Sequence, residues 1–464
     1  MLNTTLVEKV LKLAGSNGAS FAELYVERWR KKSMRLINKE LKEANSGIEY
    51  GAGLRLFYGT DVVYAYTNDL DEKSLLELAD TLRKLKTSQG SPDNKGAGGL
   101  DFRKAKANGL HAPKIDFSTK SKRYRMERLK ELDDGARLGS DIKQVEAFML
   151  EWEQDILLAN SEGTWVEDSR SRSRIIAQVI AENETGTQAG FSGPGLSVGL
   201  EIFDIYKPAD IGKKAAEQAL TNLKADKAPA GTFPVVIGNG FGGVIFHEAL
   251  GHLLETTSVA EKVSVLSDKL GEQVASKTVT YVDDGTIKNA WGSSEYDDEG
   301  LKTERTVLIE NGILNSYMVD RLGGLKTGYK ATGSGRRQDY TFAPTSRMRN
   351  TFITNGNTKK EDLFSGIEYG IYAKSMGGGE VKPGSGEYNF GVKEGYIIRN
   401  GKIEEPIKGA MLLGKGPESI NKIVAVSDDR ANGPGMCGSL SGSIPTEVGQ
   451  PHLLISDIVV GGEA

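Results

Sequence analysis

Apolar residues recur at two different periods along the first half of the chain. Spacings of three and four predict amphipathic helices, and strict alternation with polar residues predicts half-buried antiparallel strands. The helices are expected over about 5–14, 71–86, 118–133 and 209–223, and the strands over 22–27, 53–58, 144–153 and 173–181, with a surface loop over 87–99. Thr5 and Glu8 form a capping box that would begin the first helix. The mixture predicts an α+β fold class, with antiparallel strands in this half.

The pattern changes in a polar stretch near residue 226, where we place a domain boundary. Residues 1–225 are expected to form an N-terminal α+β domain, and residues 226–464 a largely β C-terminal domain. The second domain opens with a buried strand at 233–237, followed by one short helix. Asn-Gly pairs at the centres of 306–314 and 396–403 predict two hairpins. Of the 464 residues, 57 are glycine, against a typical ~7%, which indicates many tight turns.

Composition narrows the classes of protein that the chain can represent. The net charge is −4 with 26% charged residues, and no basic stripe of the kind that grips nucleic acid is present. A single cysteine excludes an internal disulfide framework and fits a reducing compartment. The N-terminus lacks the apolar core of a signal peptide, and no apolar run approaches the ~20 residues of a membrane span. We therefore expect a cytoplasmic protein without nucleic-acid or membrane partners.

The short helix of the second half carries the strongest chemical signal. His247 and His252 are two of only four histidines, and Glu248 lies beside the first. Zinc peptidases need neutral imidazoles to hold the ion and a carboxylate to take a proton from water. The spacing is i, i+5, which on an ideal helix turns the rings about 140° apart. A zinc site therefore requires the helix to distort between Ala249 and His252, where Gly251 favours a break; otherwise one histidine is buried and the other exposed.

A competing motif overlaps this segment. Residues 238–243 match the G-x-G-x-x-G dinucleotide fingerprint between a strand and a helix, and Asp268 follows at a distance suited to a ribose-binding acid. The second strand that such a fold needs, around 263–266, is short and flanked by charge. We favour the simpler interpretation, in which the glycines form a tight turn from strand to helix.

A catalytic zinc usually has three protein ligands, so a third must come from elsewhere in the chain. The candidates are Cys437, His452, His111 and Glu255. Cys437 lies in a glycine-rich segment that would allow close approach to an ion, although a lone cysteine is more often a small buried apolar residue. His452 precedes an apolar strand and is expected to be packed. The residues alone leave this choice open.

Other polar clusters have simpler interpretations. The acidic runs 283–285 and 297–300 lack the alternating ligands of a calcium loop and are expected to be turn residues. The glycine run 377–379 could admit a peptide at a strand edge, but a glycine turn is the simpler interpretation. Arg336 and Arg337 could bind a carboxylate or face solvent.

Taken together, these motifs resemble those of a known family, the TldD/PmbA metallopeptidases, once described as modulators of DNA gyrase. The likeness extends over nearly the whole chain and is closest to the TldD branch. It is carried by Phe246-His247-Glu248-Ala249-Leu250-Gly251-His252, Val282-Asp283-Asp284-Gly285-Thr286, Asp297-Asp298-Glu299-Gly300, Gly333-Ser334-Gly335-Arg336-Arg337, Glu368-Tyr369-Gly370-Ile371-Tyr372, Gly435-Met436-Cys437-Gly438 and Val459-Val460-Gly461-Gly462.

The resemblance implies one zinc ion (Zn2+) per chain, held by His247, His252 and Cys437, with Glu248 as the catalytic base. It also implies hydrolysis of small or unfolded peptides by metal-activated water. Family members pair around an enclosed chamber, as homodimers or with an inactive PmbA-like (TldE) paralogue that lacks this site. We expect an active peptidase of H-E-x-x-x-H type, and the alternative is a zinc-stabilised scaffold that binds partners without catalysis. The residues that bind substrate are not predicted.

Overall fold

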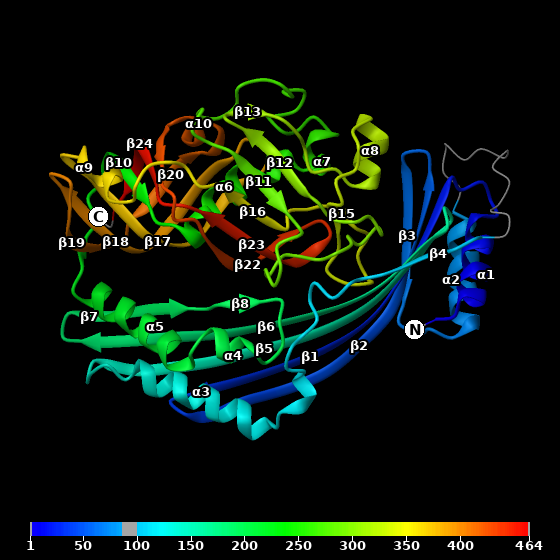
Figure 1. Cartoon of the computed structure of the whole chain (residues 1–464), viewed down its shortest axis with the longest axis horizontal. Helices are drawn as coiled ribbons and strands as arrows, with labels where there is room; N and C mark the ends of the chain where they lie inside the picture. Colours follow the sequence, from blue (N-terminus) through cyan, green and yellow to red (C-terminus); the bar gives the residue numbers. More distant parts are fainter. Residues whose placement is uncertain (1, 86–99, 463–464) are drawn as a thin grey trace.

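The computed structural model describes residues 2–85 and 100–462, so the loop expected at 87–99 lies outside the described residues. Figure 1 shows one long curved sheet with helices at both of its ends, and above it a part built mostly of strands. The α+β fold class is confirmed, with antiparallel strands in the N-terminal half and a largely β C-terminal half. Within the described ranges, no helix has the length and apolar character needed to cross a membrane.

The long sheet contains all the strands up to residue 196. Its strand order is β3-β2-β1-β5-β6-β4, with β7 and β8 also paired to β6. Among the described residues of this sheet, the β4–β6 pairing alone is parallel. The strands span β1 (Phe21–Ile37), β2 (Glu40–Tyr58), β3 (Asp61–Thr67), β4 (Arg103–Lys106), β5 (Ile142–Asn160), β6 (Thr164–Asn183), β7 (Gly186–Ser192) and β8 (Gly195–Leu196). Four of them have 17 to 20 residues, so the sequence prediction found their positions but not their lengths.

Helices cover one face of the long sheet in two groups. The helices at 4–15 and 72–83 contribute to one apolar cluster, and those between 117 and 223 contribute to a second, at the opposite end of the sheet (Figure 1). The helices of this half are α1 (Thr4–Gly15), α2 (Glu72–Arg83), η1 (Phe117–Thr119), α3 (Lys122–Ala136), α4 (Ile202–Ile205) and α5 (Pro208–Leu223). The predicted capping box of α1 is wrong: the side chain of Asn3, one position before the helix, accepts a hydrogen bond from the Leu6 amide. Asn is among the preferred N-cap residues, so the helix begins earlier than Thr5.

The C-terminal half contains two large sheets and a two-stranded one. The strand path β17-β10-β24-β20-β18 is closed into a ring by pairing of β17 with β18. The ring and its extensions use β9 (Asp226–Lys227), β10 (Gly231–Ile237), β17 (Tyr369–Lys382), β18 (Glu387–Arg399), β19 (Lys402–Lys408), β20 (Met411–Lys415), β21 (Ile423–Val426) and β24 (Leu453–Gly461). The second sheet has the order β13-β12-β11-β16-β23-β22. Its strands are β11 (Tyr281–Asp284), β12 (Arg305–Glu310), β13 (Ile313–Leu314), β16 (Asn350–Ile353), β22 (Ala431–Ser439) and β23 (Gly442–Gln450), and β14 (Gly335–Arg336) pairs with β15 (Thr345–Ser346).

Short helices lie between and around these sheets. They are η2 (Gly240–Gly243), α6 (Val244–Ala249), η3 (Gly251–Leu254), α7 (Thr256–Val259), α8 (Arg321–Thr327), α9 (Asp362–Ser365) and α10 (Gly416–Asn421). Ile245, Phe246 and Ala249 of α6 belong to the same buried apolar cluster as Val235 and Ile371 of the strand ring. Both predicted Asn-Gly hairpins are present, between β12 and β13 and between β18 and β19. Helix α6, which carries His247 and Glu248, is therefore fixed against the core of the C-terminal half.

A buried network of charges joins the long sheet to the C-terminal half. The carboxylate of Glu23 on β1 accepts hydrogen bonds from Arg55 (2.8 Å) and Arg337 (2.6 Å), and Arg55 also donates to Glu299 (2.8 Å). Arg170 donates in the same region to Asp298. The acids of the run 297–300 are therefore not solvated. Asp298 and Glu299 are buried partners of arginines from the other half, and the buried Asp297 accepts hydrogen bonds from backbone amides. Arg337 binds a carboxylate, the first of the two roles left open by the sequence.

Candidate metal centre

The helix that carries His247 breaks before it reaches His252. Helix α6 ends at Ala249, Leu250 leaves helical geometry at φ −132° and ψ −49°, and a 3-10 turn carries His252. A Cβ atom on Gly251 would lie 2.2 Å from the Met348 sulfur atom, so only glycine fits this backbone without a shift. The predicted distortion is present, and it brings the two imidazole rings to a centroid distance of 5.4 Å.

Four potential ligand side chains converge at this break. One donor atom from each of His247, Glu248, His252 and Cys437 lies within 4.8 Å of the other three. Cys437 comes from β22, the edge strand of its sheet, and its Sγ atom lies 3.2 Å from the Nε2 atom of His252. The nearest Glu248 oxygen lies 3.5 Å from the same nitrogen atom. Two imidazoles and a thiol form a donor set that suits zinc.

Each histidine ring is oriented by a hydrogen-bonding partner at its Nδ1 atom. The Nδ1 atom of His247 lies 2.8 Å from the Thr351 hydroxyl, and Nδ1 of His252 lies 2.9 Å from a Glu255 oxygen. These contacts leave Nε2 of each ring directed toward the cluster. Such outer partners fix the ring orientation and the tautomer of metal-binding histidines. The sequence offered no signal for Thr351, because a hydroxyl residue in a strand is common.

The electrostatics of the cluster favour a cation between ionised donors. Burial would raise the pKa of Cys437, but the charges of His247 and His252 outweigh it and lower this pKa to about 5. The pKa of Glu248 is lowered to about 2, because the hydrogen bond to His252 and the nearby positive charges outweigh burial. The pKa of His252 is raised well above its ordinary value, as Glu255 and Cys437 overcome the effect of burial. The carboxylate and thiolate are thus held in their metal-binding forms.

The other candidate ligands lie outside the cluster. Glu255 contacts the Nδ1 atom of His252 and is therefore a partner of that ring. The two ring nitrogens of His452 contact Tyr372 (3.0 Å) and Asp429 (2.7 Å), so this histidine is a packed residue, as expected. His111 is buried elsewhere, and neither of its ring nitrogens has a hydrogen-bond partner among the described residues.

The glycine fingerprint at 238–243 forms a tight turn, the interpretation favoured from the sequence. A Cβ atom on Gly243 would lie 2.6 Å from the Gly449 carbonyl oxygen, because η2 packs directly on β23. Residues 263–266 form no strand, and Asp268 pairs with Lys262 (3.1 Å). The glycine run 377–379 does not form a turn; it lies within β17, where the register with β18 shifts.

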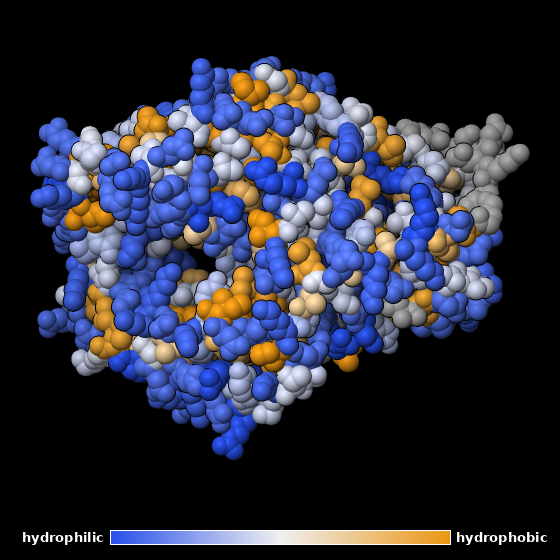
Figure 2. All heavy atoms as spheres, viewed as in Figure 1, coloured by the Kyte–Doolittle hydropathy of each residue, from blue (hydrophilic) through white to orange (hydrophobic). Residues whose placement is uncertain are grey.

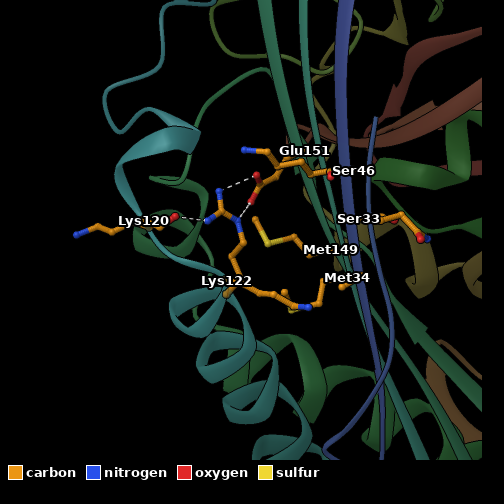
Figure 3. Close-up of a pocket in the computed structure, with 11 residues that line it drawn as sticks. Ser33, Met34, Ser46, Lys120, Lys122, Met149 and Glu151 are labelled. Carbon is orange, nitrogen blue, oxygen red and sulfur yellow. Dashed lines mark hydrogen bonds and ion pairs between the residues drawn. The ribbon is translucent and has the colours of Figure 1, made fainter. Parts of the chain in front are cut away.

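A separate cavity of about 340 Å³ lies on the long sheet. It is bounded by β1, β2, β5 and the segment that begins α3 (Figure 3). The buried Arg125 on its wall has no donor left for a ligand. Its guanidinium donates to Glu151 and to the carbonyl oxygens of Phe117 and Lys120. The side chain of Lys120 extends away from the cavity (Figure 3). None of the candidate metal ligands lines it.

Comparison with protein families identifies the chain. The family model for domain 1 of the PmbA/TldA metallopeptidases matches residues 22–86, the model for their central domain matches 114–223, and the model for their C-terminal domain matches 230–462. The chain belongs to the PmbA/TldD family of metallopeptidases. The four candidate ligand residues lie within residues 230–462, the region matched by the C-terminal domain of this family.

Proteins with similar sequences belong to the same family. A Haemophilus influenzae protein named "Metalloprotease TldD homolog" is 35% identical, with 99% of this chain and 97% of the relative covered. A Saccharolobus solfataricus protein named "Zinc metalloprotease TldD homolog" is 25% identical over 98% of this chain and 99% of the relative. The resemblance to the TldD branch of the PmbA/TldD family is thereby confirmed.

Solved structures share the fold at lower identity. TldE from Thermococcus kodakarensis superposes with a TM-score of 0.77 at 18% identity, covering 98% of this chain and 100% of that one. A Thermotoga maritima protein described as a candidate modulator of a DNA gyrase gives a TM-score of 0.79 at 20% identity, covering 98% and 99%. At these identities the likeness concerns the fold alone, and it covers 98% of this chain.

Proposed function

We propose that this chain is a zinc-dependent peptidase that hydrolyses small or unfolded peptides. The observation that carries the proposal is the convergence of two imidazoles, a thiol and a carboxylate at the break after α6. The metallopeptidase family and the names of the relatives support a peptidase, and the name of the Saccharolobus solfataricus relative supports zinc.

In this proposal, one zinc ion is held by Nε2 of His247, Nε2 of His252 and the thiolate of Cys437. The donor types fit zinc, and the Nδ1 partners of both rings leave the required nitrogens available. When bound, zinc lowers the pKa of a coordinated water and polarises the scissile carbonyl. The buried His247 and the buried Cys437, 2% and 4% exposed, would keep the ion away from competing solvent ligands.

Glu248 is the proposed general base. It lies next to His247 in sequence and its side chain is 30% exposed, so it is open to an incoming peptide. A carboxylate there can take a proton from the attacking water and pass it to the leaving amine. Its low pKa in the metal-free protein reflects the positive imidazoles, which are neutral when they bind a metal.

The alternative function is a zinc-stabilised scaffold without catalysis. One observation favours it: Glu248 belongs to the same 4.8 Å group as the other three donors, and four protein ligands would close the site. The two functions differ in the role of this carboxylate. As a base, it can be replaced without loss of zinc, whereas as a fourth ligand it cannot.

We further propose that the active form is a dimer, either of this chain or with a PmbA-like (TldE) paralogue. The structural likeness to TldE supports a partner of this kind. The proposed compartment is the cytoplasm, which fits the single cysteine. An enclosed chamber would admit extended chains and exclude folded domains.

The test is to digest one sequence presented both as a stably folded domain and as an unfolded variant, with and without a chelator, and to identify products by mass spectrometry. We expect cleavage of the unfolded form only, its loss with chelator and its return when zinc is added. Equal cleavage of both forms would contradict the chamber. Cleavage that persists in chelator would contradict the zinc mechanism.

A further inference from the structure

Arg347 lies between the two segments that bring the proposed ligands together. Its side chain is fully buried. On one side, Nη2 donates to the carbonyl oxygen of Cys437 (2.5 Å), and Nη1 donates to the Ser441 hydroxyl and the Gly442 carbonyl (both 3.0 Å). A single guanidinium therefore holds β22 at the ligand residue and also holds the turn that joins β22 to β23.

The other side of the Arg347 side chain faces Glu255, the hydrogen-bonding partner of His252. Its Nε atom lies 4.0 Å from one oxygen of Glu255, whose second oxygen lies 2.9 Å from Nδ1 of His252. This Nε atom is buried and has no hydrogen-bond partner among the described residues. The arrangement links His252 through Glu255 and Arg347 to Cys437. Its Arg347–Glu255 step is an ion pair at 4.0 Å, and the Glu255 oxygen in that pair also accepts a hydrogen bond from the Met348 amide.

The Cys437 strand needs such a link because it must be held at a fixed distance from His252. Cys437 lies on an edge strand that is paired on one side only, and 185 positions separate it from His252. A metal site requires its donors to be held within about 0.5 Å of the productive geometry. The planar guanidinium can bind several acceptors at fixed angles, which a lysine ammonium cannot do.

We propose that Arg347 is a positioning residue that holds the Cys437 strand in register with the His252 turn and so sets the affinity for the metal ion. The proposal rests on the proposed function only in assigning His252 and Cys437 as ligands. Arg347 itself donates no atom to the metal and takes no part in proton transfer. Its effect should therefore appear in metal binding, before any peptide is added.

The experiment measures zinc affinity of the full-length protein by competition with a chromogenic chelator, for Arg347→Met and Arg347→Lys. Loss of an outer partner of this kind typically costs 10–100-fold in metal affinity, and we expect about that loss for Arg347→Met. Arg347→Lys retains the positive charge but not the forked set of N–H donors. Its zinc affinity should therefore lie between those of Arg347→Met and the unsubstituted protein. With cobalt in place of zinc, the thiolate-to-metal charge-transfer band should weaken or shift in both variants.

Arg336 supplies a matched control. It is also buried (5% exposed) and donates to two carbonyl oxygens, those of Met348 (2.5 Å) and Pro445 (2.7 Å), but forms no hydrogen bond or ion pair with Cys437 or Glu255 among the described residues. Arg336→Met should lower the melting temperature and leave the zinc affinity of the folded protein unchanged. Wild-type affinity in Arg347→Met, or equal losses in the two methionine variants, would overturn the proposal.

Two further outcomes complete the test. Should Arg347→Met fail to fold, Arg347→Lys decides: a full cobalt band and full zinc affinity would overturn the proposal, and a loss in both would support it. An unsubstituted protein that binds no zinc would overturn the proposed function as well. A failure confined to Arg347 is distinguishable, because the unsubstituted protein would then bind zinc normally.

Discussion

The Sγ atom of Cys437 lies 3.2 Å from the Nε2 atom of His252, although 185 positions separate the two residues. The contact joins an edge strand of the second C-terminal sheet to the 3-10 turn after α6. Neither segment alone has a complete donor set. The site therefore forms only when the C-terminal half has folded, so folding and metal binding should be coupled.

The first prediction concerns the protonation of Cys437 in the metal-free protein. Because the pKa is lowered from 9.0 to about 5, the stability contributed by the thiolate is fully present above pH 9 and is lost as the pH falls through about 5. The raised pKa of His252 acts in the opposite direction, and its contribution is lost as the pH rises through the raised value. The ultraviolet absorbance of the thiolate should titrate with a midpoint near pH 5.

The chain is well suited to this titration because Cys437 is its only cysteine. Cys437→Ser supplies the baseline from tyrosine and peptide absorbance. A midpoint near pH 9, the ordinary value for a thiol, would show that the imidazoles do not stabilise the thiolate.

The second prediction concerns the break in the helix. Gly251→Ala places a Cβ atom 2.2 Å from the buried sulfur atom of Met348, so the turn that carries His252 must shift. We expect a loss of about 1–3 kcal/mol in the free energy of unfolding, as for other overpacked cores, together with weaker zinc binding. Gly438→Ala is the control, since nothing lies within 4 Å of its added Cβ atom next to Cys437. Equal behaviour of the two variants in urea unfolding and zinc competition would contradict the packing argument.

The third prediction concerns the buried network between the two halves. Glu23→Gln removes the charge that faces both Arg55 and Arg337. Breaking a buried pair in this way costs about 3–5 kcal/mol, because it leaves an uncompensated charge. Glu49→Gln, whose pair with Lys31 is 57% exposed on the glutamate side, should cost about 1 kcal/mol or less. Urea unfolding measures both, and similar small losses would show that the network does not stabilise the junction.

Local sequence patterns predicted the elements whose signals are local. The periodicity over 209–223 gave α5, and the two Asn-Gly pairs gave hairpins, because turn type and helix face depend on neighbouring residues. The spacing of His247 and His252 predicted a break in the helix for the same reason. The boundary at residue 226 and the roles of the site residues stay predictions.

The features that the sequence did not predict, such as the full lengths of the strands, depend on distant partners. The long strands β1 and β6 carry charged residues such as Glu23 and Arg170, which read as surface positions but are buried against the C-terminal half. The acidic runs at 283–285 and 297–300 were both expected to be turn residues. That prediction is wrong, because Asp283 and Asp284 lie buried in β11 and the acids of 297–300 are buried as well. Thr351 and Arg347 are common residue types, and only the fold places them behind a proposed ligand.

The central claim is that Glu248 acts as a base beside a zinc ion held by three other residues. The most direct measurement is to determine zinc content and peptide turnover together for Glu248→Gln, with Cys437→Ser for comparison. We predict that Glu248→Gln retains one zinc per chain and loses about 10²–10⁴-fold in turnover, whereas Cys437→Ser loses zinc and activity together. Near-wild-type turnover in Glu248→Gln would contradict the account, and loss of its zinc would instead make Glu248 a ligand of a closed, structural site.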